Sequence, residues 1–153
     1  MSHADVSQEI LNCECPGATI IPVILSTDKT LVTTFRGKSA YPIYLTIGNI
    51  PKEIRCKPSC RAYILIGYLP TSKLEHITNK SSRRRSLANL FHAAMNYIIS
   101  PLATSGLDGI HLTGGDGIER QGHPLFAAYC TDYPEQVLVA CCKTGTCAEC
   151  EIL

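Results

Sequence analysis

The sequence lacks an excess of charge of either sign. It contains 14 Lys and Arg against 13 Asp and Glu in 153 residues, a formal net charge of +1. Proteins that attract nucleic acid through their overall field carry a large positive excess, so any basic surface on this chain has to be local. One local run is present, at Arg83–Arg85.

The sequence also lacks long apolar runs. No stretch approaches the roughly 20 residues that span a bilayer, and the opening MSHADVSQEI has acids but no apolar segment of the secretory type. No internal repeat or low-complexity tract is present. We therefore expect an intracellular protein with no membrane partner. In a reducing compartment its 9 cysteines are expected to be buried thiols or zinc ligands rather than disulfides.

The length and the 45% hydrophobic content predict one compact domain. Residues 1–17 are polar and show no periodicity, so we expect a poorly ordered lead-in. Residues 18–140 are expected to form the core, and residues 141–153 a Cys-rich tail.

Apolar runs predict the strands. The run ATIIPVILSTD (18–28) is β-branched and does not alternate, which is typical of a strand covered on both faces, and it closes at Asp28. LVTTF (31–35) and YPIYLTIGNI (41–50) follow, and the three runs predict an antiparallel meander. AYILIGYLP (62–70) is a candidate for a further strand.

A helix and a last strand follow. From Ser86 the apolar residues recur at helical spacing, and Pro101 is expected to end the helix. The segment GLDGIHLTGGDG (106–117) is turn-prone. The run HPLFAAYCTD (123–132) predicts a strand that closes at Asp132.

This order of elements predicts an α/β fold of the ribonuclease H-like class. In that fold three antiparallel strands are followed by a crossover helix and a fourth strand, which lies parallel beside the first. Asp28 and Asp132 would then lie together, where a hard cation such as Mg²⁺ relieves the repulsion between two carboxylates. The alternative is that both are ordinary turn residues at strand ends.

Several long segments resemble the Plavaka transposase family, DNA transposon proteins of mushroom-forming fungi related to the CACTA group. The resemblance covers roughly residues 17–150 and is carried by ATIIPVILSTDKT, FRGKSAYPIYLTIGNIPKEIR, ILIGYLPTSKLEHITNK, RRRSLANLFHAAM and GDGIERQGHPLFAAYCTDYPEQVLV. It implies a ribonuclease H-like core with an Asp-Asp-Glu (DDE) or Asp-Asp-Asp triad. Such a core cleaves and joins transposon-end DNA in the nucleus through two divalent metals, Mg²⁺ or Mn²⁺.

Carried over by position, the resemblance makes Asp28 the first acid and Asp132 the second, with Asp116 of GGDG as the alternative for the second. In the family a third acid follows a substantial insertion beyond the second, whereas this chain ends at Leu153. We therefore expect a fragment or decayed copy with an incomplete core and weak or no catalysis. The oligomeric state stays open.

The tail motif CAEC (147–150) has the C-x₂-C spacing of a zinc half-site, so Cys147 and Cys150 are candidate Zn²⁺ ligands. Unused thiols are the alternative. The adjacent pair Cys141 and Cys142 is poorly spaced to complete regular tetrahedral geometry. Cys56 and Cys60 are expected to be free thiols, and His92 a packed histidine.

The run Arg83–Arg85, with Lys80 and Arg61, is a candidate contact for DNA phosphates. The alternative is that these residues only form the solvent-exposed start of the helix. Two rival functions follow. One is a non-catalytic DNA-binding module that uses this basic patch; the other is a partial domain with no molecular role, whose exposed apolar surface favours aggregation.

Overall fold

The computed structural model describes residues 17–33 and 38–142. Most of the expected lead-in and of the Cys-rich tail therefore lies outside the described residues. The elements are β1 (Thr19–Thr27), β2 (Thr30–Leu31), β3 (Ser39–Ala40), β4 (Pro42–Ile47), α2 (Lys52–Arg55), the 3₁₀ turn η1 (Pro58–Cys60), β5 (Ile64–Tyr68), α3 (Lys80–Asp108), β6 (Ile110–Thr113), β7 (Glu119–Cys130) and α4 (Tyr133–Val139).

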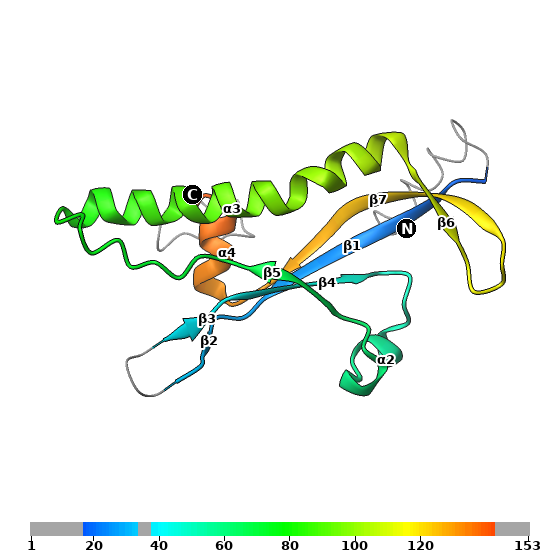
Figure 1. Ribbon diagram of the computed structural model, residues 1–153, viewed down its shortest axis with the longest axis horizontal. Helices are drawn as coiled ribbons and strands as arrows, with labels where there is room; N and C mark the ends of the chain where they lie inside the picture. Colours follow the sequence, from blue (N-terminus) through cyan, green and yellow to red (C-terminus); the bar gives the residue numbers. More distant parts are fainter. Residues whose placement is uncertain (1–16, 34–37, 143–153) are drawn as a thin grey trace.

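The main sheet has five strands in the order β5-β4-β1-β7-β6 (Figure 1). β1 pairs antiparallel with β4, and β4 pairs antiparallel with β5. β7 lies parallel beside β1, and β6 lies antiparallel beside β7. The fold is thus mixed α/β, and the first and last long strands are parallel neighbours as predicted.

The prediction that LVTTF forms the middle strand of the meander was wrong. Among the described residues of this region, up to Thr33, only Thr30–Leu31 is a strand, β2, and it pairs with β3 in a separate two-stranded sheet. Leu31 and Val32 are 60% and 62% exposed, so this short run has no surface to bury against. The meander instead takes its third strand from β5, in the apolar run that follows η1.

The predicted end of the helix was also wrong, because α3 continues through Pro101 to Asp108. Proline has no N–H to donate to the carbonyl of Tyr97, one turn earlier. The hydroxyl of Ser100 donates to that carbonyl instead, at 3.1 Å. With this carbonyl satisfied, the helix runs on and ends at Gly109, whose φ is 75°.

The turn-prone segment contains a strand that the sequence did not predict. Ile110–Thr113 forms β6, which makes a hairpin with β7. β7 begins at Glu119 rather than His123 and ends at Cys130. Asp132 therefore does not close the strand but stands at the N-cap of α4.

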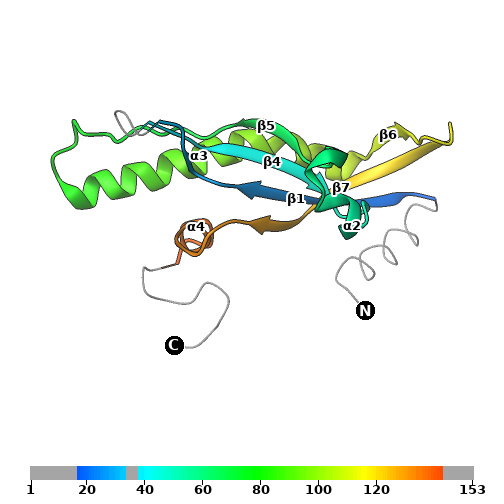
Figure 2. The same cartoon turned by 90° about the horizontal axis from the view of Figure 1, so that it is seen from below.

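The core lies between the sheet and α3, which runs along one face of the sheet (Figures 1 and 2). Its buried members are Val23, Leu25, Ile43, Leu69, Phe91 and Met95. Each contributes roughly 1.5–3 kcal/mol when fully buried, so this cluster fixes β1 and β4 beneath the helix. Within the two described ranges, no helix is long and apolar enough to cross a membrane.

Candidate functional site

The sheet places Asp28 and Asp132 at the same edge. The last parallel pair of β1 and β7 is Ser26 with Cys130, and each aspartate stands two residues beyond its member of that pair. Neighbouring strands lie about 4.8 Å apart, so both aspartates follow the carboxyl ends of adjacent parallel strands. Both side chains are exposed.

The carboxylate of Asp132 is not used as a helix cap. Aspartate at an N-cap ordinarily accepts a hydrogen bond from a backbone N–H in the first helical turn. Asp132 has the extended N-cap backbone, at φ −70° and ψ 159°, but its side chain makes no capping hydrogen bond. Its oxygens are therefore available at the sheet edge.

Glu135 is a residue of this site that the sequence analysis missed. It is only 7% exposed, and its Oε1 accepts hydrogen bonds of 2.5 Å from the hydroxyls of both Thr27 and Tyr129. Thr27 ends β1 and Tyr129 lies near the end of β7, so Glu135 joins the two strand ends. We call Asp28, Asp132 and Glu135 the acidic edge.

Two tyrosines at this edge serve as protonated donors. Burial, followed by hydrogen bonding to Glu135, raises the pKa of Tyr129 above its ordinary value. Burial also raises the pKa of Tyr41, with further contributions from a hydrogen bond to Glu135 and the charge of Asp132. Both phenols therefore keep their protons at neutral pH and donate to Glu135.

The alternative acid, Asp116, lies at the opposite end of the sheet. It sits in the turn before β7, where its two oxygens pair with Arg120 at 2.6 Å and 3.0 Å. Hydrogen bonding to this guanidinium holds the pKa of Asp116 well below its usual range. β7 is 12 residues long, so the structure does not bring Asp116 to Asp28.

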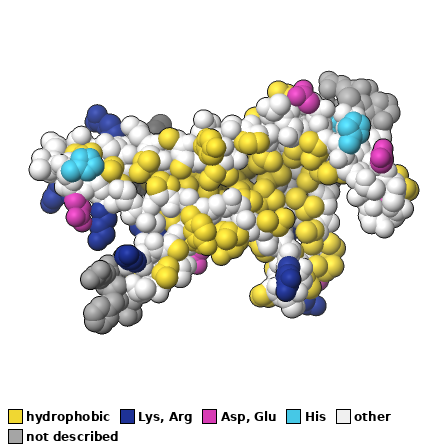
Figure 3. Space-filling view, viewed as in Figure 1, with side chains coloured by type: hydrophobic (Ala, Val, Ile, Leu, Met, Phe, Trp, Pro, Cys, Tyr) yellow, Lys and Arg dark blue, Asp and Glu magenta, His cyan; other side chains and the backbone are white. Residues whose placement is uncertain are grey.

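The N-terminal turns of α3 lie at the left-hand end of the molecule, toward which β1 and β7 also run (Figure 1), and they carry Lys80 and Arg83–Arg85. Lys80, Arg84 and Arg85 are exposed there, and Arg83 is half-buried. The space-filling view shows Lys and Arg side chains at that end, at the left (Figure 3). We call Lys80 and Arg83–Arg85 the basic start of α3.

Arg61 does not join the basic start of α3. It stands at the C-cap of η1, just before β5 begins. β5 runs parallel to β1, because each is antiparallel to β4. Arg61 therefore lies at the other end of the sheet, near α2, away from the acidic edge (Figure 1).

A family model described as Plavaka transposase matches residues 1–153, the whole chain. The chain belongs to the Plavaka transposase family. Family membership indicates a function derived from that of a DNA transposase. No curated protein and no solved structure matches the chain.

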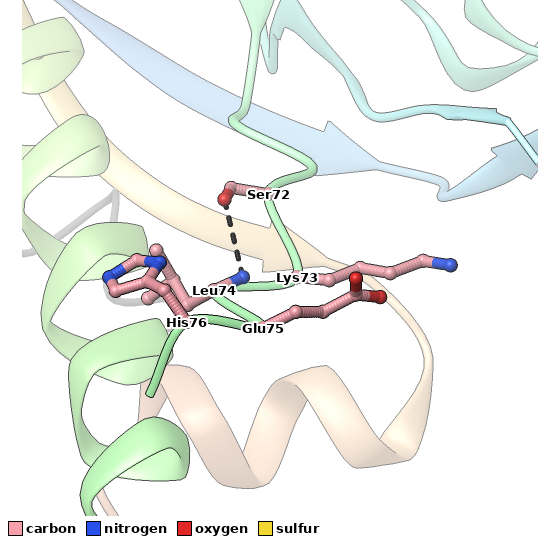
Figure 4. Close-up of a pocket in the computed structure, with 5 residues that line it drawn as sticks. All are labelled: Ser72, Lys73, Leu74, Glu75 and His76. Atoms are coloured by element: carbon pink, nitrogen blue, oxygen red, sulfur yellow. Dashed lines mark hydrogen bonds between the residues drawn. The ribbon is translucent and has the colours of Figure 1, made fainter. Parts of the chain in front are cut away.

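In this Plavaka chain, the loop that leads into α3 forms a shallow, open hollow of about 480 Å³, lined by Ser72–His76. The hydroxyl of Ser72 accepts a hydrogen bond of 3.4 Å from the N–H of Leu74. Lys73 and Glu75 extend away from α3, whereas Leu74 and His76 lie toward it (Figure 4). Lys73 thus adds an exposed cation between β5 and the basic start of α3.

The cysteines of the Plavaka chain divide into two groups. Cys56, Cys60, Cys130 and Cys141 are exposed free thiols and Cys142 is a half-buried one, so the general expectation of buried thiols was wrong for these residues, although free thiols were expected at Cys56 and Cys60. The other four, Cys13, Cys15, Cys147 and Cys150, lie outside the described residues. In the described part of the chain, no three His, Cys, Asp or Glu side chains are grouped so that they could hold a metal ion. The acidic edge therefore offers two exposed carboxylates rather than a complete set of metal ligands.

Proposed function

We propose that this chain is a ribonuclease H-like transposase core that acts on transposon-end DNA in the nucleus, with Asp28 and Asp132 as the metal-binding acids. One observation carries the proposal. The parallel pairing of β1 and β7, with Ser26 opposite Cys130, brings the two acids to a common edge. Family membership supplies the class of substrate, which is DNA.

The strand order supports a ribonuclease H-like core. The meander β1-β4-β5, the crossover by α3 and the return of β7 beside β1 follow the order of elements of that fold. β6 adds an antiparallel strand on the far side of β7. This hairpin lies away from the acidic edge, so it leaves the proposed site unobstructed.

The donor chemistry at the acidic edge fits a hard divalent cation. Mg²⁺ and Mn²⁺ prefer oxygen ligands, and Mg²⁺ is commonly held by one or two carboxylates while it keeps waters or substrate phosphates. Asp28 and Asp132 would hold the ion. When bound, it would supply an activated nucleophile and charge stabilisation at the phosphoryl oxygens.

The chain's own residues position the acids and the DNA. Glu135 holds the ends of β1 and β7 together through Thr27 and Tyr129. The basic start of α3 lies at the same end of the molecule and would neutralise backbone phosphates, which guanidinium groups bind through two parallel hydrogen bonds.

Slow turnover is expected. Two exposed acids stand at the edge, while the Oε1 atom of the third carboxylate, Glu135, already accepts two hydrogen bonds. A site short of carboxylates binds metal weakly and neutralises less of the charge that develops in the transition state. The chain therefore represents a core whose chemistry is attenuated.

Nicking of supercoiled DNA tests the proposal. The purified chain should nick in the presence of Mg²⁺ or Mn²⁺ but not with a chelator. Asp28→Asn and Asp132→Asn should each remove the activity, because each loses a metal ligand. Asp116→Asn, the same change at the opposite end of the sheet, should keep it. Nicking that survives Asp28→Asn, or its absence from the unaltered chain, would overturn the catalytic proposal.

A non-catalytic DNA-binding module is the second candidate, and the exposure of the basic start of α3 favours it. In this case DNA retention survives Asp28→Asn. Replacing Arg83–Arg85 with alanine lowers the affinity and reduces the dependence of log K on log salt by roughly 1 per lost phosphate contact. Retention without nicking would select this function over the first.

A further inference from the structure

The segment between β4 and β5 forms a second basic surface, apart from the basic start of α3. Residues 52–61 comprise α2 and η1, and they contain four of the chain's 14 basic residues but one of its 13 acids. The rest of the chain has 10 basic and 12 acidic residues, so this segment is strongly positive in a chain that is otherwise slightly acidic. Its cations are Lys52, Arg55, Lys57 and Arg61. We call residues 52–61 the basic projection.

The basic projection stands clear of the sheet. α2 lies below the main sheet, on the side away from α3 (Figure 1), and Lys and Arg side chains are seen there at the lower right of the space-filling view (Figure 3). Three of the four cations are exposed, and Arg55 is half-buried. Within the two described ranges, no acidic side chain forms an ion pair with any of the four. Their charge is therefore open to an anionic partner.

Local turns hold these cations in place. The N–H of Cys56 donates to the carbonyl of Lys52 at 2.9 Å, and the N–H of Arg61 donates to the carbonyl of Pro58 at 3.2 Å. Pro58 fixes the backbone at the start of η1, and Arg61, with a φ of 48°, turns the chain toward β5. A surface whose backbone is already ordered loses less conformational freedom when it binds a partner.

We propose that the basic projection binds the phosphate backbone of DNA at a second position, remote from the acidic edge. This inference rests on the proposed function, in which the chain acts on DNA, and family membership supplies that partner. Duplex DNA carries one negative charge per about 1.7 Å of its axis, and guanidinium groups bind phosphate through two parallel hydrogen bonds. Such contacts position a duplex without reading its bases. The basic projection therefore adds affinity that does not depend on sequence.

The two basic surfaces are far enough apart to contact different parts of one duplex. The basic start of α3 is at the N-terminal end of that helix, whereas the basic projection lies below its C-terminal half (Figure 1). α3 has 29 residues, and half of its length is roughly 20 Å at a rise of about 1.5 Å per residue. This is the length of about six base pairs. In this arrangement a long duplex contacts both surfaces at once, whereas a shorter one contacts only one of them.

Binding of the full chain to DNA tests the inference, with fluorescence anisotropy measured over a range of salt. The four-cation variant carries Lys52→Gln, Arg55→Gln, Lys57→Gln and Arg61→Gln. We expect it to bind a duplex of about 30 base pairs about 10-fold more weakly or worse, because each lost phosphate contact lowers the slope of log K against log salt by about 0.9. For a DNA hairpin with a stem of about six base pairs the loss should be about 2-fold or less, since such a stem cannot engage both surfaces.

Single changes provide the controls. Lys57→Gln should lower the salt slope by about 0.9. Lys38→Gln should leave it unchanged, because Lys38 precedes β3 and β3 lies at the opposite end of the molecule from α2 (Figure 1). Glu53→Gln removes the acid of the basic projection and should raise the affinity, because it removes repulsion from the phosphates. This opposite sign separates an effect of charge from a damaged fold.

The outcomes separate this inference from the proposed function. If the four-cation variant binds the long duplex as tightly as the unaltered chain while Asp28→Asn loses nicking, the inference is wrong and the catalytic proposal stands. If nicking is absent but binding of the long duplex still depends on the four cations, the inference stands and the catalytic proposal is wrong. A chain that binds no DNA contradicts both. If the four-cation variant loses binding to phosphatidylserine vesicles but keeps its DNA affinity, the basic projection contacts a membrane and the inference is overturned.

Discussion

At the scale of single residues, Glu135 determines how firmly the two strand ends are joined. Its Oε1 atom accepts from Thr27 and Tyr129, and Thr27 Oγ1 also lies 3.2 Å from the hydroxyl of Thr131. One carboxylate thereby organises hydroxyls from both parallel strands.

Replacing Glu135 with alanine should lower the free energy of unfolding by about 2 to 3 kcal/mol, because two hydroxyls at a largely buried site lose their acceptor. Urea unfolding followed by circular dichroism measures the change. Glu119→Ala, which removes an exposed carboxylate at the start of β7, should stay within about 0.5 kcal/mol of the unaltered chain. Equal small changes for both variants would contradict the role given to Glu135.

The tyrosines of the acidic edge predict a loss of stability in alkali. The pKa of Tyr129 in the folded chain is raised above the ordinary value of 10.0, so at high pH the unfolded chain releases a proton that the folded chain keeps. This contribution is complete below about pH 10 and is lost as pH rises beyond it. Urea unfolding measured from about pH 8 to about pH 11 should show that the free energy of unfolding declines less steeply in Tyr129→Phe than in the unaltered chain. Identical slopes for the two chains would refute this.

At the scale of elements, strands with continuous apolar runs could be predicted, whereas the helix end and the hairpin, which depend on particular hydrogen bonds and turn residues, were missed. β1 and the apolar part of β7 followed directly from their sequences. The extension of α3 beyond Pro101 depends on the Ser100 hydroxyl, which replaces the missing donor to Tyr97. β6 pairs with β7 across a short turn that contains Asp116 and Gly117, and an Asp-Gly pair between two strands is a local hairpin signal that the sequence analysis did not use.

The contact between α3 and β7 predicts an unusual response to a helix-favouring substitution. Gly106→Ala improves helix propensity by about 1 kcal/mol, yet a Cβ at this position would lie 2.8 Å from the backbone oxygen of Pro124. Moving α3 away from β7 to make room for the methyl group should cost more than the gain in helix propensity. We therefore expect the free energy of unfolding to fall by about 1 to 2 kcal/mol. Thermal unfolding compares this variant with Thr104→Ala, an exposed change in the same turn. A more stable Gly106→Ala chain would show that the helix moves freely.

At the scale of the whole molecule, the sheet gathers the acids and the basic start of α3 at one end. The sequence could place Asp28 and Asp132 beyond the carboxyl ends of neighbouring parallel strands, whereas their role as a shared metal site stays a prediction. It could not place Arg61, since the direction of β5 is set by its pairing with β4. Glu135 stands three residues after Asp132, as in a capping box, but its burial against Thr27 depends on the assembled sheet.

The other large feature of the molecule is the apolar edge strand β5. Ile64 and Tyr68 are 62% and 64% exposed, and β5 is the terminal strand of the main sheet. An exposed apolar edge favours pairing with another chain, so the isolated chain should self-associate as its concentration rises. Ile64→Lys should shift the mass measured by light scattering toward the monomer, because a charged edge resists pairing. Leu107→Lys, at a residue 84% exposed on α3, should leave the mass unchanged; equal effects would place the association elsewhere.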